Sequence, residues 1–311
     1  MPEIKDYINA FSTLHVNRVQ GRTSPHKPVM LLAVLALIEA GLLKENKIRY
    51  SQNLLDIFKS FFQTVQQPGD ACNPYFPFFH LQFDKFWHLQ PINGREAVAE
   101  SLITVRGPSQ ITENYDYAFL DDELFRLISS GSSRDILRQT LIERWFPSFN
   151  EQIKTVTAEE QQIAMYENNL KEPDKAAEHC ESYSEKVRDA AFSRVVREAY
   201  DYRCAASGWR VVLPDGSVMV EAAHLIPFSE SCDNDPRNGI ALVPSFHWAL
   251  DRNILSPGPD LKWHVSKILD KRNRDYHELL ELDKKPIILP MDRKYYPRPD
   301  ALEWRINKLI D

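Results

Sequence analysis

The stretch that decides the fold is VEAAHLIPFSESCDNDPRNGIALVPSFHWALDRNILS, residues 220–256. It holds two histidines with an asparagine between them, and these three residues follow one another at intervals of 14 and 9 residues: His224, Asn238 and His247. Before it, two β-prone segments flank LPDG (213–216), a sequence typical of a tight turn. We therefore expect a hairpin whose second strand ends at His224, then a loop, then a helix that begins near His247.

This order of residues resembles the HNH nuclease motif, a ββα-metal finger, in the variant without zinc-binding cysteines. The resemblance covers most of residues 186–290 and implies an endonuclease that hydrolyses DNA. It implies that His224 is the general base, since an imidazole titrates near neutral pH. His247 is then a metal ligand, and Asn238 fixes the loop through backbone hydrogen bonds and so orients the base.

The metal ligands are the point where the chain departs from the family pattern. Many HNH nucleases carry Asp or His directly before the base, and here that residue is Ala223. Glu221 lies three residues before His224, so on a strand it would face away from it. Asp251 lies four residues after His247 and shares its face on a helix, which makes it the second expected ligand. A site with few protein ligands, completed by oxygen atoms of water and substrate phosphate, favours Mg²⁺ or Mn²⁺. No structural zinc is expected.

Composition limits the classes of protein that the chain can form. Its 311 residues suffice for two domains, and 43% hydrophobic with 26% charged residues is typical of a globular protein. No run reaches the roughly 18 apolar residues of a membrane span, and the N-terminus lacks the order of a signal peptide, so we expect a cytoplasmic protein without membrane contact. The four cysteines lack C-x-x-C spacing and are read as free thiols.

The first half of the chain reads as mainly helical. The apolar stretch from 29 to 43 predicts a buried helix with Ser24 as its N-cap and its end near Gly41. Residues 51–65 predict a second helix, and residues 121–146 predict two short helices broken at SSGSS (129–133). The fold class is therefore α+β, with a mainly helical N-terminal domain and a C-terminal ββα-metal domain. The expected bounds are 1–150 for the first domain, 151–183 for a helical linker and 184–311 for the nuclease domain.

An aromatic block, YFPFFH at 75–80, lies in the predicted N-terminal domain. Together with SPHKPVMLLAVLALIEAGLL at 24–43 and the helices of 121–146, it resembles the sulfur-binding domain of phosphorothioate-dependent, type IV restriction endonucleases. The resemblance covers about residues 1–150, and the order of the two domains agrees with it. It implies that the protein binds phosphorothioated double-stranded DNA and cuts nearby.

The resemblance also assigns residues to the sulfur site. It places Phe76, Pro77 and Phe79 in the wall of a sulfur pocket, with Tyr75 and His80 at the rim. The basic stretch 15–28 contains the expected contacts to phosphate or base edges: Arg18, Arg22, His26 and Lys27. For Phe78 and Phe83 we expect core packing instead.

Two other functions remain open from the residues alone. Rings such as those at 75–80 are also suitable for a flipped base, so an HNH endonuclease that reads methylated or otherwise modified bases is an alternative. A nonenzymatic DNA-binding regulator is another. Cutting both strands usually needs two active sites, which favours a homodimer.

Overall fold

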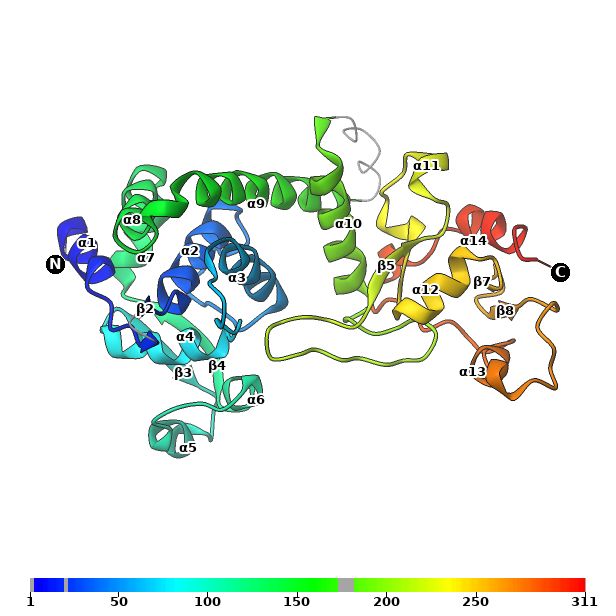
Figure 1. Ribbon diagram of the computed structural model, residues 1–311, viewed down its shortest axis with the longest axis horizontal. Helices are drawn as coiled ribbons and strands as arrows, with labels where there is room; N and C mark the ends of the chain where they lie inside the picture. Colours follow the sequence, from blue (N-terminus) through cyan, green and yellow to red (C-terminus); the bar gives the residue numbers. More distant parts are fainter. Residues whose placement is uncertain (1–2, 20–21, 173–181, 311) are drawn as a thin grey trace. The chain divides into compact units, whose positions relative to one another are not determined.

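The computed structural model describes residues 3–19, 22–172 and 182–310, and the elements below are those of this part of the chain. It divides into two compact units (Figure 1). Unit 1 comprises residues 1–161 with 213–217, and unit 2 comprises 162–212 with 218–311. No helix in the described part of the chain combines the length and the apolar character that crossing a membrane requires.

The centre of unit 1 is the helix α2, His26–Glu39. Every residue from Lys27 to Leu37 is buried, so the helix is enclosed on all sides, as its unbroken apolar sequence requires. The helices that pack against it are α3 (Gln52–Val65), α4 (Tyr75–His80), α7 (Asp122–Ser129) and α8 (Gly131–Trp145). The helix α1, Ile4–Ser12, packs on α7 and α8.

The start of α2 differs from the expected one. Its N-cap is Pro25, and no side chain caps it. The Ser24 hydroxyl lies 2.8 Å from Nδ1 of His26 instead, so the predicted Ser24 cap is wrong because the histidine ring takes its hydrogen bond. The helix ends at Glu39, and Gly41 follows with φ +70°, a backbone conformation that glycine adopts without strain.

Short strands complete unit 1. The pair β1 (Arg18–Val19) and β2 (Arg22–Thr23) precedes α2. The strand β3, Trp87–Pro91, pairs antiparallel with β4, Tyr115–Leu120, with Trp87 opposite Leu120. Between them the chain forms two short helices, α5 (Glu96–Ser101) and α6 (Pro108–Thr112) (Figure 1).

The helix α9, Asn150–Leu170, occupies most of the predicted linker. The division between the units falls inside it, after Gln161. Ile153 belongs to the core of unit 1, whereas Tyr166 and Leu170 are fully buried in the core of unit 2. This stretch therefore supplies core residues to both units. The remainder of the predicted linker includes residues 173–181, which lie outside the described residues.

Unit 2 is built on the helix α10, Glu185–Ala199, whose N-cap Ser184 accepts a hydrogen bond from the Val187 amide. It packs on an antiparallel pair, β5 (Glu221–His224) and β6 (Gly239–Leu242), in which His224 lies opposite Gly239. The helix α12, Pro244–Asp251, follows β6. The pair β7 (Leu255–Pro257) and β8 (Trp263–Val265), α13 (His277–Leu280) and α14 (Pro299–Ile306) lie further along the chain.

The hairpin expected around LPDG is only partly formed. Val212 and Val218 make an isolated bridge, but no regular strand pair flanks the turn. His224 does end a strand, yet the partner of that strand is β6, which lies beyond the intervening loop. The apolar residues Ile240 and Leu242 of β6 are fully buried, so pairing β5 with this buried strand is more favourable than the local hairpin that the LPDG turn predicts.

Candidate functional site

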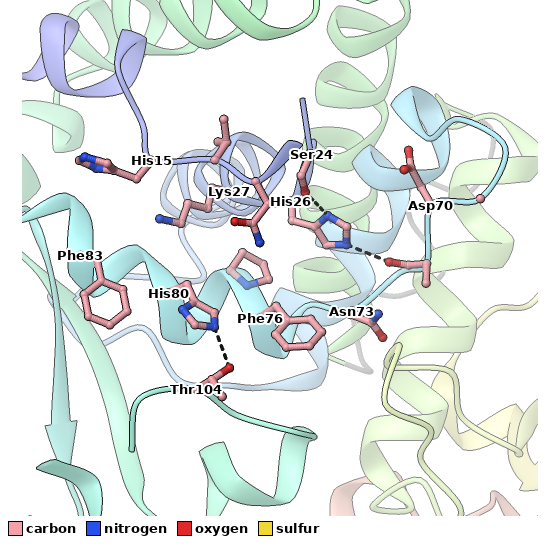
Figure 2. A pocket seen from close by; sticks show the side chains of 15 residues that line it. His15, Ser24, His26, Lys27, Asp70, Asn73, Phe76, His80, Phe83 and Thr104 are labelled. Atoms are coloured by element: carbon pink, nitrogen blue, oxygen red, sulfur yellow. Dashed lines mark hydrogen bonds between the residues drawn. The ribbon is translucent and has the colours of Figure 1, made fainter. Parts of the chain in front are cut away.

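A cavity of about 580 Å³ opens beside α4 in unit 1. The side chains around it come from Ser24 and the start of α2, from α4 and the turn after it that holds Phe83, and from residues 15–17, 69–73 and 104 (Figure 2). Its lining residues are His15, Val16, Asn17, Ser24, His26, Lys27, Gly69, Asp70, Ala71, Asn73, Phe76, Pro77, His80, Phe83 and Thr104.

The aromatic block forms a helix, and the helix divides its rings between two environments. Phe76, Pro77 and His80 of α4 line the cavity. Phe78 and Phe79, at 1% and 0% exposure, belong to the core. Because successive helical residues point about 100° apart, a run of aromatic residues can serve core and cavity together. Figure 2 shows Phe76 and His80 on α4, with Phe83 beyond them.

Three of the aromatic residues lie elsewhere than expected. Phe79, predicted as a wall of the pocket, packs its ring 6.0 Å from that of Tyr115 and does not line the cavity. Tyr75, predicted at the rim, is 7% exposed and also lies outside the lining. Phe83, expected in the core, is 51% exposed and lines the cavity. Tyr75 and Phe79 belong to α4, and Phe83 belongs to the short helix η1, Leu81–Asp84, that follows it, so the helical course of residues 75–84 sets which rings face the cavity.

His26 uses both ring nitrogens within the protein. Nε2 lies 2.8 Å from the Ala71 carbonyl oxygen and therefore donates, and Nδ1, 2.8 Å from the Ser24 hydroxyl, accepts. The ring also packs 4.9 Å from that of Phe62. Burial lowers the pKa of His26. A neutral His26 thus ties the loop at 69–73 to the start of α2, a different contact from the one predicted with DNA.

Lys27 is paired with a carboxylate at the edge of the cavity. Its ammonium lies 2.5 Å from Oδ2 of Asp84, whose side chain is only 3% exposed. The backbone amide of His15 donates to the other carboxylate oxygen at 2.8 Å, and the His15 ring lies 3.1 Å from it. Asp84 therefore holds one cation and one imidazole at the same side of the cavity.

His80 faces the cavity from the end of α4. Its Nε2 lies 3.2 Å from the Thr104 hydroxyl, and burial, with the charge of Lys27, lowers its pKa. Thr104, Asn73 and His15 are lining residues that the sequence did not single out. They lie in loops without a motif, so only the folded chain brings them to α4.

The two predicted arginines lie on the short β1–β2 pair and outside this cavity. Both side chains are exposed. Arg22 donates to the Pro68 carbonyl oxygen at 3.1 Å and lines a smaller neighbouring cavity of about 120 Å³. Arg18 lies opposite Thr23 in the strand pair.

In unit 2, His224 lines an open cleft of about 870 Å³ between α10 and the end of β5. Its ring stacks on that of Phe192, with centroids 3.9 Å apart and an interplanar angle of 4°. Nε2 lies 2.9 Å from Oδ1 of Asn234. Burial is the main cause that lowers the pKa of His224, and the charge of His247 also lowers it. The imidazole is therefore neutral near pH 7, as a general base requires.

His247 occupies a different position and does not line that cleft. Its Nδ1 lies 2.8 Å from Oε2 of Glu221, and its Nε2 lies 3.6 Å from Oδ2 of Asp251. The contact of Glu221 with His247 was not expected from the sequence. Glu221 does lie on the other face of β5 from His224, but β5 also packs against α12, which carries His247.

Asn238 is fully buried and makes three hydrogen bonds to backbone. Its Oδ1 accepts from the Ile226 amide at 2.9 Å, and its Nδ2 donates to the carbonyl oxygens of Ile226, at 2.9 Å, and Asp233, at 3.1 Å. The next residue, Gly239, approaches α10 so closely that a Cβ would lie 2.5 Å from Cγ2 of Val196. These two residues hold the loop after β5 against α10.

Among the described residues, no group of three or more histidine, cysteine, aspartate or glutamate side chains could hold a metal ion. The two carboxylates beside His247 contact opposite nitrogens of one ring, so they do not converge on one point. His247 Nε2 and Asp251 Oδ2 nevertheless fit two ligands of one ion, since adjacent ligands with bonds of about 2.1 Å lie about 3 Å apart. Mg²⁺ and Mn²⁺ sites often use few protein ligands, with water and phosphate oxygens as the others.

Comparison with known proteins gives two family matches. Residues 4–152 match the model "ScoMcrA-like, DNA sulfur-binding domain", and residues 204–256 match the model "HNH endonuclease". No curated protein matches the chain significantly.

Two solved structures are similar in part. One is a "Modification dependent TagI restriction endonuclease", at 19% identity and TM-score 0.30, covering 40% of this chain and 39% of that one. The other is the "Sulfur binding domain of SprMcrA complexed with phosphorothioated DNA", at 16% identity and TM-score 0.40, covering 50% of this chain and 94% of that one.

HNH nucleases typically use a divalent metal ion. On the two family matches, this protein joins a ScoMcrA-like DNA sulfur-binding domain, residues 4–152, to an HNH endonuclease domain that contains residues 204–256.

Proposed function

We propose that the protein is a modification-dependent restriction endonuclease that recognises phosphorothioated double-stranded DNA and hydrolyses phosphodiester bonds nearby. The observation that carries the proposal is the cavity beside α4 within the sulfur-binding domain, where the exposed rings of Phe76 and Phe83 and the buried Pro77 form an apolar lining. A site for sulfur and a site for hydrolysis in one chain are the two parts that such an enzyme needs.

The cavity suits sulfur better than oxygen. A phosphorothioate replaces one non-bridging oxygen by sulfur, a larger and softer atom that water binds less strongly. Phe76 and Phe83 offer ring atoms, and the Pro77 nitrogen carries no hydrogen to donate. An oxygen placed against them would lose its hydrogen bonds to water, at a cost of about 1–3 kcal/mol. Selectivity then comes mainly from the rejection of oxygen.

The polar side of the cavity would hold the rest of the phosphate. Lys27 has three ammonium hydrogens and gives one to Asp84, so two remain for phosphate oxygens. Asp84 fixes where that ammonium lies. Arg18 and Arg22, exposed on the β1–β2 pair, are proposed to contact neighbouring phosphates, which would position the duplex without reading its sequence.

The hydrolytic step is assigned to His224. Its imidazole takes a proton from a water molecule, the water oxygen forms a bond to phosphorus, and the bond from phosphorus to the leaving oxygen breaks. The leaving oxygen takes a proton from solvent. A bound divalent ion would supply positive charge to the phosphate and leaving oxygens.

Mg²⁺ or Mn²⁺ is the proposed ion, with His247 Nε2 and Asp251 as its protein ligands. Nδ1 of His247 cannot bind the same ion, because it points at Glu221. A histidine ligand whose other nitrogen donates to a carboxylate is held in one orientation and is more basic. We therefore assign Glu221 to orient His247.

We further propose that the enzyme acts as a homodimer, because breaking both strands takes two active sites. Its proposed location is the cytoplasm, where its DNA substrate lies.

The test uses matched plasmids with and without phosphorothioate, incubated with the whole chain and Mg²⁺ or Mn²⁺. Cleavage of the modified plasmid alone is the expected result. Equal cleavage of both plasmids, or of neither with either ion, would contradict the proposal. The variant His224→Ala should bind the modified plasmid and leave it intact, which also separates an endonuclease from a nonenzymatic regulator.

One observation favours a second substrate, DNA with a modified base. A cavity of about 580 Å³ with two exposed phenyl rings is also large enough to stack a flipped base. Competition for binding between a modified-backbone duplex and a methylated-base duplex distinguishes the two. Displacement by the methylated duplex alone would assign the site to bases.

A further inference from the structure

The imidazole of His224 has a second partner that no sequence motif indicated. Asn234, in the loop between α11 (Phe228–Ser231) and η5 (Pro236–Asn238), is 2% exposed. Its Oδ1 lies 2.9 Å from Nε2 of His224, and its Nδ2 lies 3.4 Å from the hydroxyl of Tyr166. Tyr166 is a fully buried residue of α9. The three side chains form one chain of hydrogen bonds, which runs from the half-buried His224 to the buried Asn234 and Tyr166.

This contact determines which nitrogen of the ring is basic. An amide oxygen can only accept, so Nε2 must carry the hydrogen and donate it to Asn234. The lone pair of a neutral imidazole then lies on Nδ1. The stacked Phe192 ring stops the imidazole from rotating out of its plane, since the two rings are parallel and their centroids lie 3.9 Å apart.

We infer that Asn234 is the positioning residue of the HNH site: it fixes His224 as the Nε2–H tautomer with Nδ1 as the base, and Tyr166 holds Asn234 in place. This inference rests on the proposed role of His224 as the base. It gives α9 a part in the nuclease site, beyond that of a linker. Asn238, which the motif marks, bonds only to backbone and does not touch the ring.

A neutral partner has a chemical consequence. An amide fixes the ring without adding negative charge: its hydrogen bond raises the pKa of His224, but burial lowers that pKa by more, so the imidazole stays unprotonated near neutral pH. A carboxylate at the same distance would favour the imidazolium and raise its pKa by about 1–3 units. The other charged or titratable groups near His224 are Glu185, Arg188 and Asp189 of α10, Asp233 of the loop and His247 of α12. Replacing Asn234 leaves all of these groups in the protein, so a shift of the acid limb reports the change at residue 234.

The first experiment is ¹⁵N NMR of the whole chain with ¹⁵N-histidine, the His224 signals being those missing from His224→Ala. The shifts and couplings of the two nitrogens are expected to report hydrogen on Nε2. Hydrogen on Nδ1 would overturn the inference. This readout needs no cleavage, so it stands even if the proposed substrate is wrong.

The second experiment is the pH dependence of cleavage for two variants. Asn234→Asp should move the acid limb of kcat/KM upward by at least about 1 pH unit. Asn234→Ala should lower kcat about 100-fold, the lower end of what a general base contributes, with KM unchanged. Thermal melting and DNA binding serve as controls for the fold. An acid limb of Asn234→Asp that superimposes on that of the wild type, or wild-type kcat in Asn234→Ala, would overturn the inference.

A third variant tests the contribution of α9. Tyr166→Phe removes the hydroxyl and keeps the ring in the core. We expect a smaller loss of kcat than in Asn234→Ala and the same direction of change. A Tyr166→Phe variant with wild-type kcat would remove Tyr166 from the inference.

Discussion

Replacing Glu221 by alanine tests how the structure prepares His247 for a metal ion. The Glu221 carboxylate accepts from Nδ1 of His247 at 2.8 Å, and no motif of the sequence marks it. A hydrogen bond to a charged group contributes about 1.5–3 kcal/mol, equivalent to about 10–150-fold in affinity. Glu221 is 54% exposed, so water replaces part of the lost interaction and the lower end applies. We expect Mn²⁺ to bind about tenfold more weakly.

The assay is Mn²⁺ titration followed by electron paramagnetic resonance, which counts free Mn²⁺ directly and does not depend on cleavage. The half-saturating Mn²⁺ concentration for cleavage should rise by the same factor. Glu221→Gln keeps an oxygen acceptor without the charge, so its loss should be smaller. His247→Ala, which removes a proposed ligand, should show the largest loss.

Asp260→Ala is the matched control. Asp260 makes the same kind of contact, 2.8 Å from Nε2 of His264, outside the proposed metal site. It should leave Mn²⁺ affinity unchanged. The reasoning is refuted if Glu221→Ala binds Mn²⁺ as tightly as Asp260→Ala does.

Three further changes have defined outcomes. Phe76→Ala opens the cavity to water and should reduce the preference for a sulfur duplex over its oxygen twin by up to about 1–3 kcal/mol. Phe119→Ala, which removes a half-buried ring outside the cavity, should leave that preference unchanged, and the same preference in both variants would contradict the pocket assignment. Asp84→Asn breaks the buried ion pair with Lys27 and should lower the free energy of unfolding in urea by about 3–5 kcal/mol. A urea midpoint equal to that of the wild type would argue against that pair. Burial lowers the pKa of His224, so kcat/KM should begin to fall with acid only below pH 6.5. A fall centred at or above pH 6.5 would show that the imidazole is not desolvated.

The nuclease motif was readable because its spacing is local. His224, Asn238 and His247 lie within 24 residues, and their order on strand, loop and helix limits how they can fold. Glu221 and Asn234 were missed for different reasons. Strand alternation predicts only that Glu221 faces away from His224, and it cannot predict that β5 also packs against α12. Asn234 lies in an irregular loop, where no periodicity predicts which way a side chain points.

The sulfur-binding domain was predictable in outline and less so in detail. An unbroken apolar run correctly predicted a central helix at α2. The sequence YFPFFH could not reveal which rings face the cavity, because that depends on whether the segment is helical or extended. It is helical, so Phe79 is in the core and Phe76 is in the cavity. The contacts of His26 and Lys27 depend on Ala71 and Asp84, residues 45 and 57 positions away.

The most direct test of the account is the affinity of the His224→Ala chain for a duplex with one sulfur at a defined phosphorus stereocentre, compared with its all-oxygen twin. Rejection of oxygen by the apolar cavity predicts tighter binding of the sulfur duplex by about 5–150-fold, the equivalent of about 1–3 kcal/mol. Equal affinity for both duplexes would contradict the account.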